Sequence, residues 1–348
     1  MRGSFFMAER QAAILFINMA KGFGGGEYQS EQLMKHVSGY EVFFLGKKSG
    51  KFIPHLKQAN YPIKIITLWQ AIKLVLTRRP VIIHALDGRG AHFAALLKKI
   101  SGQTALITRR VSIPFRHKSS FRSYQSVDKL IGISHQVSEE MRAIHPDVRT
   151  IYGCIKPLKE NTEFEEQYFS TNSYRLSVAH IGNLLKVKNF PMTIELARRF
   201  PSIHFFIVGS GELETELKTQ ASGIPNITFI PFNPYIGSVL KHMDVQLLPS
   251  SSEGMGFVIL EGYSYQVPVI ANKAGGIPEI VQQGETGFLI EDNRLEGYQD
   301  TLQFLLDNPS KLTEMKSNIH AYMQKMDFTA SRMTKEYEEV YQELLNKA

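Results

Sequence analysis

The sequence predicts an α/β protein made of two Rossmann-like domains that face a cleft. Short apolar runs alternate with helix-like stretches along most of the 348 residues, which is typical of parallel sheets covered by helices. The alternation begins with Ala13–Met19, an unbroken apolar run followed at once by the glycine-rich turn Gly22–Gly26. A second series begins with Leu176–Ile181, which Gly182 closes. The same layout is therefore expected twice in the chain.

The other strands are predicted from further apolar runs between helical stretches. In the first half these are Glu41–Leu45, Val81–His84, Thr104–Thr108, Lys129–Ile133 and Arg149–Tyr152. In the second half they are His204–Val208, Ile227–Ile230, Val245–Leu248, Pro268–Ala271 and Thr286–Leu289. The polar, aperiodic stretch Lys156–Ser173 predicts the connection between domains, and the amphipathic Met333–Leu345 predicts a terminal helix.

Size and composition are those of a soluble globular protein, with 43% hydrophobic and 21% charged residues. No apolar run approaches the ~20 residues that a membrane-spanning helix needs. The start, Met1–Arg10, is too short and too interrupted for a secretory signal. The only cysteine, Cys154, excludes an internal disulfide and fits a reducing compartment, so we expect a cytoplasmic protein.

Charge is distributed unevenly along the chain. Residues 1–160 contain 25 Lys and Arg against 10 Asp and Glu, whereas residues 161–348 contain 15 against 23. Such asymmetry points to an anionic partner for the first half: a membrane surface, nucleic acid or a phosphorylated substrate. A solvated basic surface without a partner is the alternative interpretation.

The most informative stretch is Ser250–Gly262. It follows the apolar run Val245–Leu248 and holds Glu253, two glycines within the next three residues, and Glu261 on a helix-like pattern. This order predicts a strand, a loop with accessible amides, and a helix start, where free N–H groups and the helix dipole favour phosphate. Two carboxylates beside such a site can accept hydroxyl hydrogen bonds, which suggests a sugar at one end of a diphosphate and a ribose at the other.

Other loops of the second half contribute weaker signals. Lys188 lies between a predicted strand and helix, where a lysine neutralises a diphosphate or simply faces solvent. The turn Gly209–Glu212 lacks the third glycine of a dinucleotide fingerprint, which argues against a nicotinamide enzyme. Gly275–Glu279 places a proline and a glutamate at a helix start and predicts a second phosphate cradle. No Cys/His cluster has metal-ligand spacing.

In the first half, candidates follow the predicted strands, where ligands bind in doubly wound folds. They are His84, Arg109 and Arg110, although a histidine at a strand end is more often a packed, hydrogen-bonded one than a catalyst. The two arginines open a basic and aromatic segment that continues through Phe115, Arg116, His117, Lys118, Phe121, Arg122 and Tyr124. Its interpretations are an acceptor or membrane loop and a solvated basic loop. Trp69–Arg79 suits a bilayer surface, although a helix facing the core is the more common outcome.

In this order, the motifs resemble the retaining glycosyltransferases of family 4, which have the GT-B architecture. The match extends over most of the chain and is densest from Leu176 to Glu291. Its most specific part is the pair Glu253 and Glu261, with seven residues between them. The Gly209–Gly211 turn, the Gly275–Glu279 run and the predicted Thr286–Phe288 strand follow the family's usual order.

The resemblance implies a role for each matched residue. Glu253 would contact the donor sugar and Lys188 the diphosphate, and these two are the catalytic candidates. Glu261 would bind the ribose hydroxyls. The remaining donor-binding candidates are Gly24, Gly25, Asn183, Gly209, Gly211, Met255, Gly256 and Phe257, and the acceptor candidates are His84, Arg109 and Arg110. Asn183 stands where the family usually has an arginine, which removes one positive charge unless Lys186 replaces it.

The resemblance also sets the expected domains. The last helix of this family crosses back, so residues 1–158 with 328–348 would bind the acceptor and residues 170–327 the nucleotide sugar. The donor would be a UDP- or GDP-linked sugar, with no cofactor and no metal. The acceptor would be an anionic glycan or glycolipid, as in lipopolysaccharide or envelope polysaccharide synthesis, with peripheral contact to the inner face of the cytoplasmic membrane and no nucleic acid partner. Alternatives are a GT-B enzyme acting on a small soluble sugar or sugar nucleotide, and a non-enzymatic module that binds anions or nucleic acid.

Overall fold

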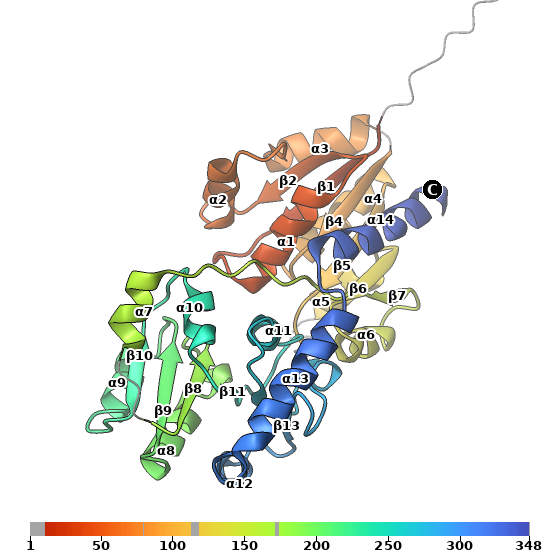
Figure 1. Ribbon diagram of the computed structural model, residues 1–348. Coiled ribbons are helices and arrows are strands. Elements are labelled where there is room, and N and C mark those ends of the chain that lie inside the picture. Colours follow the sequence, from red (N-terminus) through yellow and green to blue (C-terminus); the bar gives the residue numbers. More distant parts are fainter. Residues whose placement is uncertain (1–10, 79, 113–117, 171–173, 348) are drawn as a thin grey trace, which may run out of the picture. The chain divides into compact units, whose positions relative to one another are not determined.

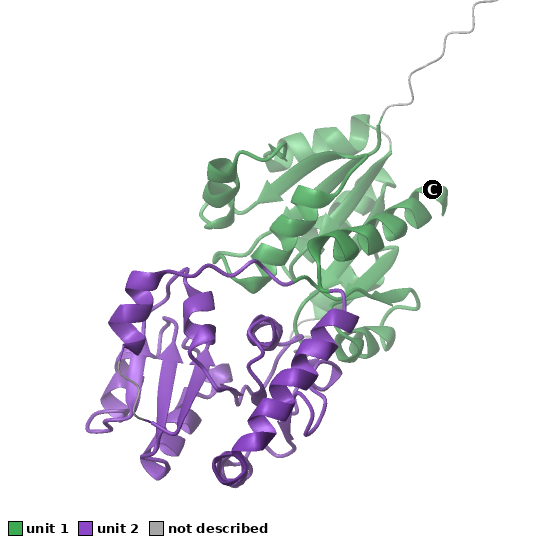
Figure 2. Ribbon diagram, viewed as in Figure 1, with its two compact units in different colours: residues 1–154, 328–348 green, residues 155–327 purple. Residues whose placement is uncertain are grey.

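The computed structural model describes residues 11–78, 80–112, 118–170 and 174–347. Expectations for Met1–Arg10 and for Arg79, Phe115, Arg116 and His117 lie outside these residues. The chain divides into two units, one of residues 1–154 with 328–348 and one of residues 155–327 (Figure 2). The first unit therefore takes its last helix from the end of the chain.

Unit 1 is built on a seven-stranded parallel sheet in the order β3-β2-β1-β4-β5-β6-β7 (Figure 1). The strands are β1 Ala13–Asn18, β2 Glu41–Gly46, β3 Lys64–Ile65, β4 Val81–Ala85, β5 Thr104–Arg109, β6 Lys129–Gly132 and β7 Val148–Thr150. The two-residue β3 was not predicted, because it is too short to give an apolar run. β1 and β4 are buried along their whole length, as strands covered on both faces must be.

Helices cover both faces of this sheet. They are α1 Gly25–His36, α2 Phe52–Ala59, α3 Leu68–Thr77, α4 Gly90–Ser101, α5 Lys118–Gln125, α6 His135–Arg142 and α14 Ala330–Lys347. One core cluster joins alternate strand residues to side chains of α3, α4, α5 and α6, and the other joins the opposite face to α1, α2 and α14. The helix α14 contacts α1 and closes the second layer.

Unit 2 repeats the plan with a six-stranded parallel sheet in the order β10-β9-β8-β11-β12-β13. Its strands are β8 Leu176–Ile181, β9 Ile203–Val208, β10 Ile227–Ile230, β11 Val245–Leu248, β12 Val269–Asn272 and β13 Gly287–Ile290. Its helices are α7 Thr162–Phe169, α8 Phe190–Arg199, α9 Glu214–Gln220, α10 Ile236–Lys241, α11 Phe257–Tyr263, α12 Leu295–Asp307 and α13 Pro309–Lys325. Single 3₁₀ turns are η1 Lys186–Lys188 and η2 Ile277–Glu279. The predicted fold, two Rossmann-like α/β domains, is confirmed.

Two local predictions were wrong. The stretch Lys156–Ser173 contains α7, because the Asn161 side chain caps its start by accepting from the Phe164 amide at 2.8 Å. Phe164 and Phe169 then pack in the core of unit 2. The helix expected after Gly275–Gly276 is only the 3₁₀ turn η2. Among the helices of the described residues, none has the length and apolar character needed to cross a bilayer.

Candidate active site

The loop between β11 and α11 is held by the neighbouring connection from β8 to α8. The Ser251 amide donates to the Val187 carbonyl at 2.9 Å. The Lys188 ammonium lies 2.5 Å from a carboxylate oxygen of Glu253, and both side chains are largely buried. The structure therefore brings together the two residues that the sequence nominated as catalytic, although they are 65 positions apart.

A second turn supports the same loop from the side of β12. Gly275 has φ +55, and a Cβ there would lie 1.8 Å from the Glu253 carbonyl oxygen. The Gly276 amide donates to the Gly254 carbonyl at 3.1 Å, and the Asn272 side chain donates to the Ser250 carbonyl at 2.8 Å. The expected second phosphate cradle is thus in contact with the first loop, and close backbone packing explains the glycine at position 275.

The helix α11 begins directly at this loop. Gly256 precedes it with φ +80, a left-handed conformation that favours glycine. Met255 and Gly256 are buried, and Phe257 is partly exposed. The N–H groups at such a helix start have no partner within the helix.

Glu261 lies on α11 and contacts a lysine that the sequence did not nominate. Its carboxylate is 3.2 Å from the ammonium of Lys156. Burial raises the pKa of Glu261, and the charge of Lys156 opposes this shift. Lys156 was missed because it lies in the aperiodic stretch, 105 positions before its partner, where no pattern marks it.

The glycines of the β9 loop also have a packing explanation. A Cβ at Gly209 would lie 1.9 Å from the Gly182 carbonyl oxygen, and a Cβ at Gly211 would lie 2.6 Å from the Leu184 carbonyl oxygen. These contacts shape the connection that carries Asn183, which is exposed. Gly209 and Gly211 thus lie against the loop that leads to Lys188.

In unit 1, the structure places His84 in the core. It has no exposed surface, and its ring nitrogens bond the Tyr341 hydroxyl and the Thr108 hydroxyl, each at 2.8 Å. Burial lowers the pKa of His84 well below its ordinary value. Because both nitrogens are engaged, this histidine ties the sheet to α14 and offers neither nitrogen to an acceptor. The alternative interpretation of a packed histidine is the one that the structure supports.

The two arginines at the end of β5 also take part in packing. The Arg109 guanidinium is buried and lies over the Tyr124 ring, 5.6 Å from its centre. Arg110 is partly buried and donates to the Leu86 carbonyl at 2.6 Å. Burial lowers the pKa of Arg110, and neighbouring groups including Glu27 raise it. The acceptor role of both arginines stays a prediction.

Gly24 and Gly25 form the start of α1. The Gly24 amide donates to the Glu27 carboxylate at 2.9 Å. A Cβ at Gly25 would meet no atom within 4 Å, and one at Gly24 would meet only the Glu27 carboxylate at 3.7 Å. Unlike Gly209, Gly211 and Gly275, these glycines have open space beside them, which leaves room for close approach of a ligand. Their donor-binding role is untested.

Acidic, histidine and cysteine side chains do not gather into a metal-binding group in the described parts of either unit. The charged groups beside the Glu253 loop are instead carboxylates, each paired with a lysine. Such an arrangement can bind hydroxyl groups through the carboxylates and phosphate through the lysines.

Comparison with known proteins finds a family match for unit 2 and a fold match for most of the chain. Residues 162–322, nearly all of unit 2, match the model described as glycosyl transferases group 1. The fold of the Anabaena HepE crystal structure in complex with UDP-glucose matches with a TM-score of 0.82, at 19% identity, over 95% of this chain and 99% of that one. At this identity the likeness shows the fold, which agrees with the expected GT-B architecture.

Relatives match parts of the chain. An uncharacterized glycosyltransferase of Haemophilus influenzae is 30% identical over 147 residues, 40% of this chain and 42% of its own length. The N-acetyl-alpha-D-glucosaminyl L-malate synthase of Bacillus anthracis is 25% identical over 63% of this chain and 60% of its own length. The lipopolysaccharide core biosynthesis glycosyltransferase LpsE of Rhizobium meliloti is 25% identical over 41% of this chain and 43% of its own length. The matched stretches thus span at most 60% of these three relatives.

Proposed function

We propose that the protein is a retaining glycosyltransferase of family 4 that moves a hexosyl group from a UDP- or GDP-linked sugar to an anionic or lipid-linked glycan. The observation that carries this proposal is the contact of Lys188 with Glu253 in the unit that matches group 1 glycosyl transferases. The acceptor would belong to lipopolysaccharide or another envelope polysaccharide, and the enzyme would work in the cytoplasm at the inner face of the membrane. The relative named for lipopolysaccharide core biosynthesis and the basic first half support this acceptor class.

In the proposed reaction, the leaving diphosphate gains charge while the sugar carbon becomes oxocarbenium-like. Lys188 has three N–H donors, so it can bind a phosphate oxygen while it still contacts Glu253. Removing one such preorganised donor typically costs ~3–4 kcal/mol of transition-state stabilisation. The amides of Met255, Gly256 and Phe257 would add donors, Glu253 would bind the sugar hydroxyls, and Glu261 the ribose. The acceptor would attack from the face that the diphosphate leaves, which retains the anomeric configuration.

The two units would supply different substrates. Unit 2 would hold the nucleotide sugar, and unit 1, residues 1–158 with 328–348 in the predicted division, would hold the acceptor. Gly24 and Gly25 of unit 1 would approach the donor phosphates. Closure of the two units would exclude water that otherwise hydrolyses the donor.

The test is a transfer reaction with a panel of UDP- and GDP-sugars and rough-type lipopolysaccharide acceptors. We expect one donor to be consumed and the new glycosidic bond to keep the donor's anomeric configuration, as read by NMR of the product. Inversion would contradict the retaining mechanism. Failure of every donor to be consumed, with or without acceptor, would contradict the transferase assignment.

Transfer to a small soluble acceptor is a second candidate, supported by the relative named as a malate synthase. A soluble acceptor panel of hydroxy acids, inositol phosphates and sugar phosphates separates the two candidates. Transfer to a member of that panel, with none to glycolipid, would favour the second.

A further inference from the structure

Exposed apolar side chains gather on two helices of unit 1. Among the large apolar side chains that are exposed in the described residues, Trp69 (81%) and Leu76 (54%) lie on α3, and Leu96 (52%) and Ile100 (45%) lie on α4. Leu68 on α3 is exposed as well. Scattered exposed leucines are ordinary, but their concentration on two helices in contact with each other is typical of an interaction surface.

The helical spacing places these residues on outer stripes. Trp69, Lys73 and Leu76 share one side of α3, while Ala71 and Val75 face the core. On α4, Leu96, Lys99 and Ile100 share the outer side, while Ala94 and Leu97 are buried. We define the α3–α4 face as Trp69, Lys73, Leu76, Leu96, Lys99 and Ile100. It combines apolar side chains with two exposed lysines.

Three helices of this layer, α3, α4 and α5, carry charge of one sign. The sequences of α3, α4 and α5 contain five lysines and arginines and no acidic residue. The helix α14, on the other side of the sheet, carries four glutamates. The acidic groups next to these three helices are engaged. Asp128 pairs with Lys98, and Asp87 accepts from the amides of Met19 and Gly90. On the neighbouring α6, Glu139 pairs with Arg142 and Glu140 accepts from the Ser112 hydroxyl. The surface formed by α3, α4 and α5 is therefore basic.

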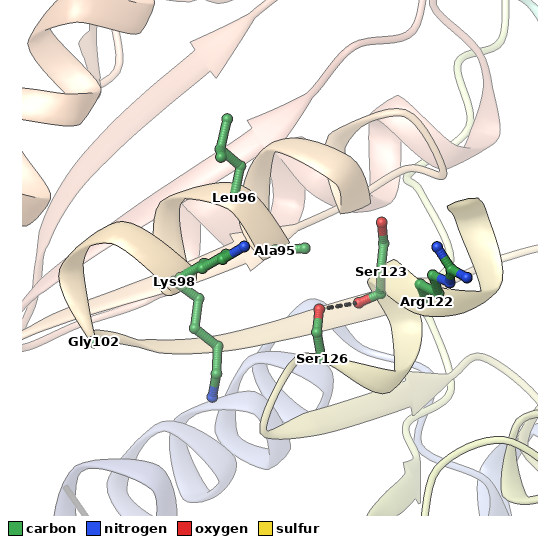
Figure 3. Close-up of a pocket in the computed structure, with 8 residues that line it drawn as sticks. Ala95, Leu96, Lys98, Gly102, Arg122, Ser123 and Ser126 are labelled. Carbon is green, nitrogen blue, oxygen red and sulfur yellow. Dashed lines mark hydrogen bonds between the residues drawn. The ribbon is translucent and has the colours of Figure 1, made fainter. Parts of the chain in front are cut away.

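An open groove of about 480 Å³ adjoins the face, between α4 and α5. Its lining includes Leu96 and Lys99 from α4 and the exposed Arg122 and buried Ser123 from α5 (Figure 3). This volume lies within the usual range of small-ligand sites. Cations beside an apolar wall match the chemistry of a phospholipid headgroup whose acyl chains begin next to the phosphate.

We propose that the α3–α4 face docks on an anionic phospholipid bilayer, with Trp69 and Leu96 in the interface and Lys73, Lys99 and Arg122 on lipid phosphates. Tryptophan is favoured at bilayer interfaces, and lysines beside apolar side chains bind anionic lipid. A second copy of the chain would bring an acid-free surface against itself, with lysines opposed. Docking extends the proposed function, because it would hold the enzyme at a lipid-linked acceptor, but vesicle binding can be measured without any transfer.

The first experiment uses Trp69, which is the only tryptophan of the chain. The full-length protein is mixed with vesicles of phosphatidylcholine, alone or with phosphatidylglycerol, at low and high salt. We expect co-sedimentation with the anionic vesicles at low salt, a shift of Trp69 emission to shorter wavelength, protection from iodide, and quenching by brominated lipid. Absence of co-sedimentation, or co-sedimentation with Trp69 still open to iodide, would overturn the proposal.

The second experiment compares two double charge reversals. Lys73→Glu with Lys99→Glu changes the α3–α4 face, and Lys57→Glu with Lys335→Glu changes exposed lysines on α2 and α14 of the other layer. Each basic residue at an anionic surface contributes roughly a fivefold factor, so the first pair should weaken vesicle binding by at least about 25-fold. The second pair should change it little. Equal losses in both would overturn the proposal, since net charge alone would then explain binding.

Three controls complete the design. Lys188→Met should bind vesicles like the parent, so loss of transfer and loss of docking are separable. A dimer in solution that Trp69→Ala dissociates would overturn the bilayer as occupant. Failure to bind vesicles, together with tight RNA binding that falls steeply with salt and is lost in Lys73→Glu, would overturn it as well.

Discussion

At the end of β4 in unit 1, His84 is fully buried and bonds Tyr341 and Thr108. In the loop after β11 in unit 2, Glu253 keeps part of its surface and contacts Lys188, while two other loops bond the backbone of Ser251 and Gly254 on either side of it. His84 lies near the carboxyl end of β4 and Glu253 in the loop after β11, so both are at the edge of a parallel sheet where ligands bind in this class of fold. The comparison shows that position at a strand end only makes a residue a candidate for ligand binding. The partners of its polar atoms determine whether those atoms stabilise the fold or are available to a ligand.

The largest effect should come from Lys188→Met. If this ammonium stabilises the leaving diphosphate, kcat should fall about 10²–10³-fold. Lys218→Met is the matched control, because Lys218 is an exposed lysine of the same unit that pairs with Glu214 on α9. Steady-state kinetics at saturating donor checks this. If kcat of Lys188→Met equals that of the parent, the end of β11 would be no more catalytic than the end of β4.

His84→Ala should act on stability instead of turnover. The Tyr341 hydroxyl loses its bond to His84, whereas the Thr108 hydroxyl keeps its bond to Tyr337. An unsatisfied buried group costs ~1–3 kcal/mol, and we expect a loss of that size in the free energy of unfolding. Urea denaturation measures it, and kcat per folded molecule should stay at the parent value. His204→Ala is the control, because His204 is partly exposed and bonds Thr228. A fall in kcat with unchanged stability would give His84 the catalytic role that its packing argues against.

Substitution of Gly275 tests how closely its turn packs against the Glu253 loop. Gly275→Ala would place a Cβ against the Glu253 backbone, whereas Gly284→Ala at φ +75 meets no atom within 4 Å. Both substitutions strain the backbone, but only the first adds overpacking, which costs about 1–3 kcal/mol. We expect Gly275→Ala to be less stable by that margin and to lose donor affinity. An equal fall in melting temperature for the two variants would mean that the Glu253 loop accommodates the added Cβ without further cost.

Two buried histidines, one in each unit, make the free energy of unfolding depend on pH. Burial holds the pKa of His84 and of His180 well below 6.5. The unfolded chain therefore binds protons first as pH falls, so this contribution to stability is complete above about pH 6.5 and is lost below it. The expected slope is up to about 1.4 kcal/mol per pH unit for each histidine. Urea midpoints at several pH values, in the parent and in His84→Ala, should show a shallower slope in the variant; identical slopes would refute this assignment.

Much of the fold was predictable, and the reasons are local. β8 was predicted at its observed bounds because a mainly apolar run from Leu176 ends at Gly182. Glu253 and Glu261 were recognisable from their spacing around a glycine loop. Partnerships were not predictable, since Tyr341 lies 257 positions after His84 and Lys156 lies 105 positions before Glu261. The helix α7 was missed because its signal is a single Asn161 cap in a polar stretch.

The central claim is that the Glu253 loop of unit 2 holds the nucleotide sugar. The most direct measurement is donor affinity by calorimetry and thermal shift, with UDP- and GDP-sugars, for the parent and Glu261→Gln. A donor at 100 times its dissociation constant should stabilise the parent by ~2.7 kcal/mol. Glu261→Gln should weaken binding about tenfold, as expected for one lost hydrogen bond to a charged group. Parent and variant with equal affinity, or a parent that binds none of these donors, would contradict the account.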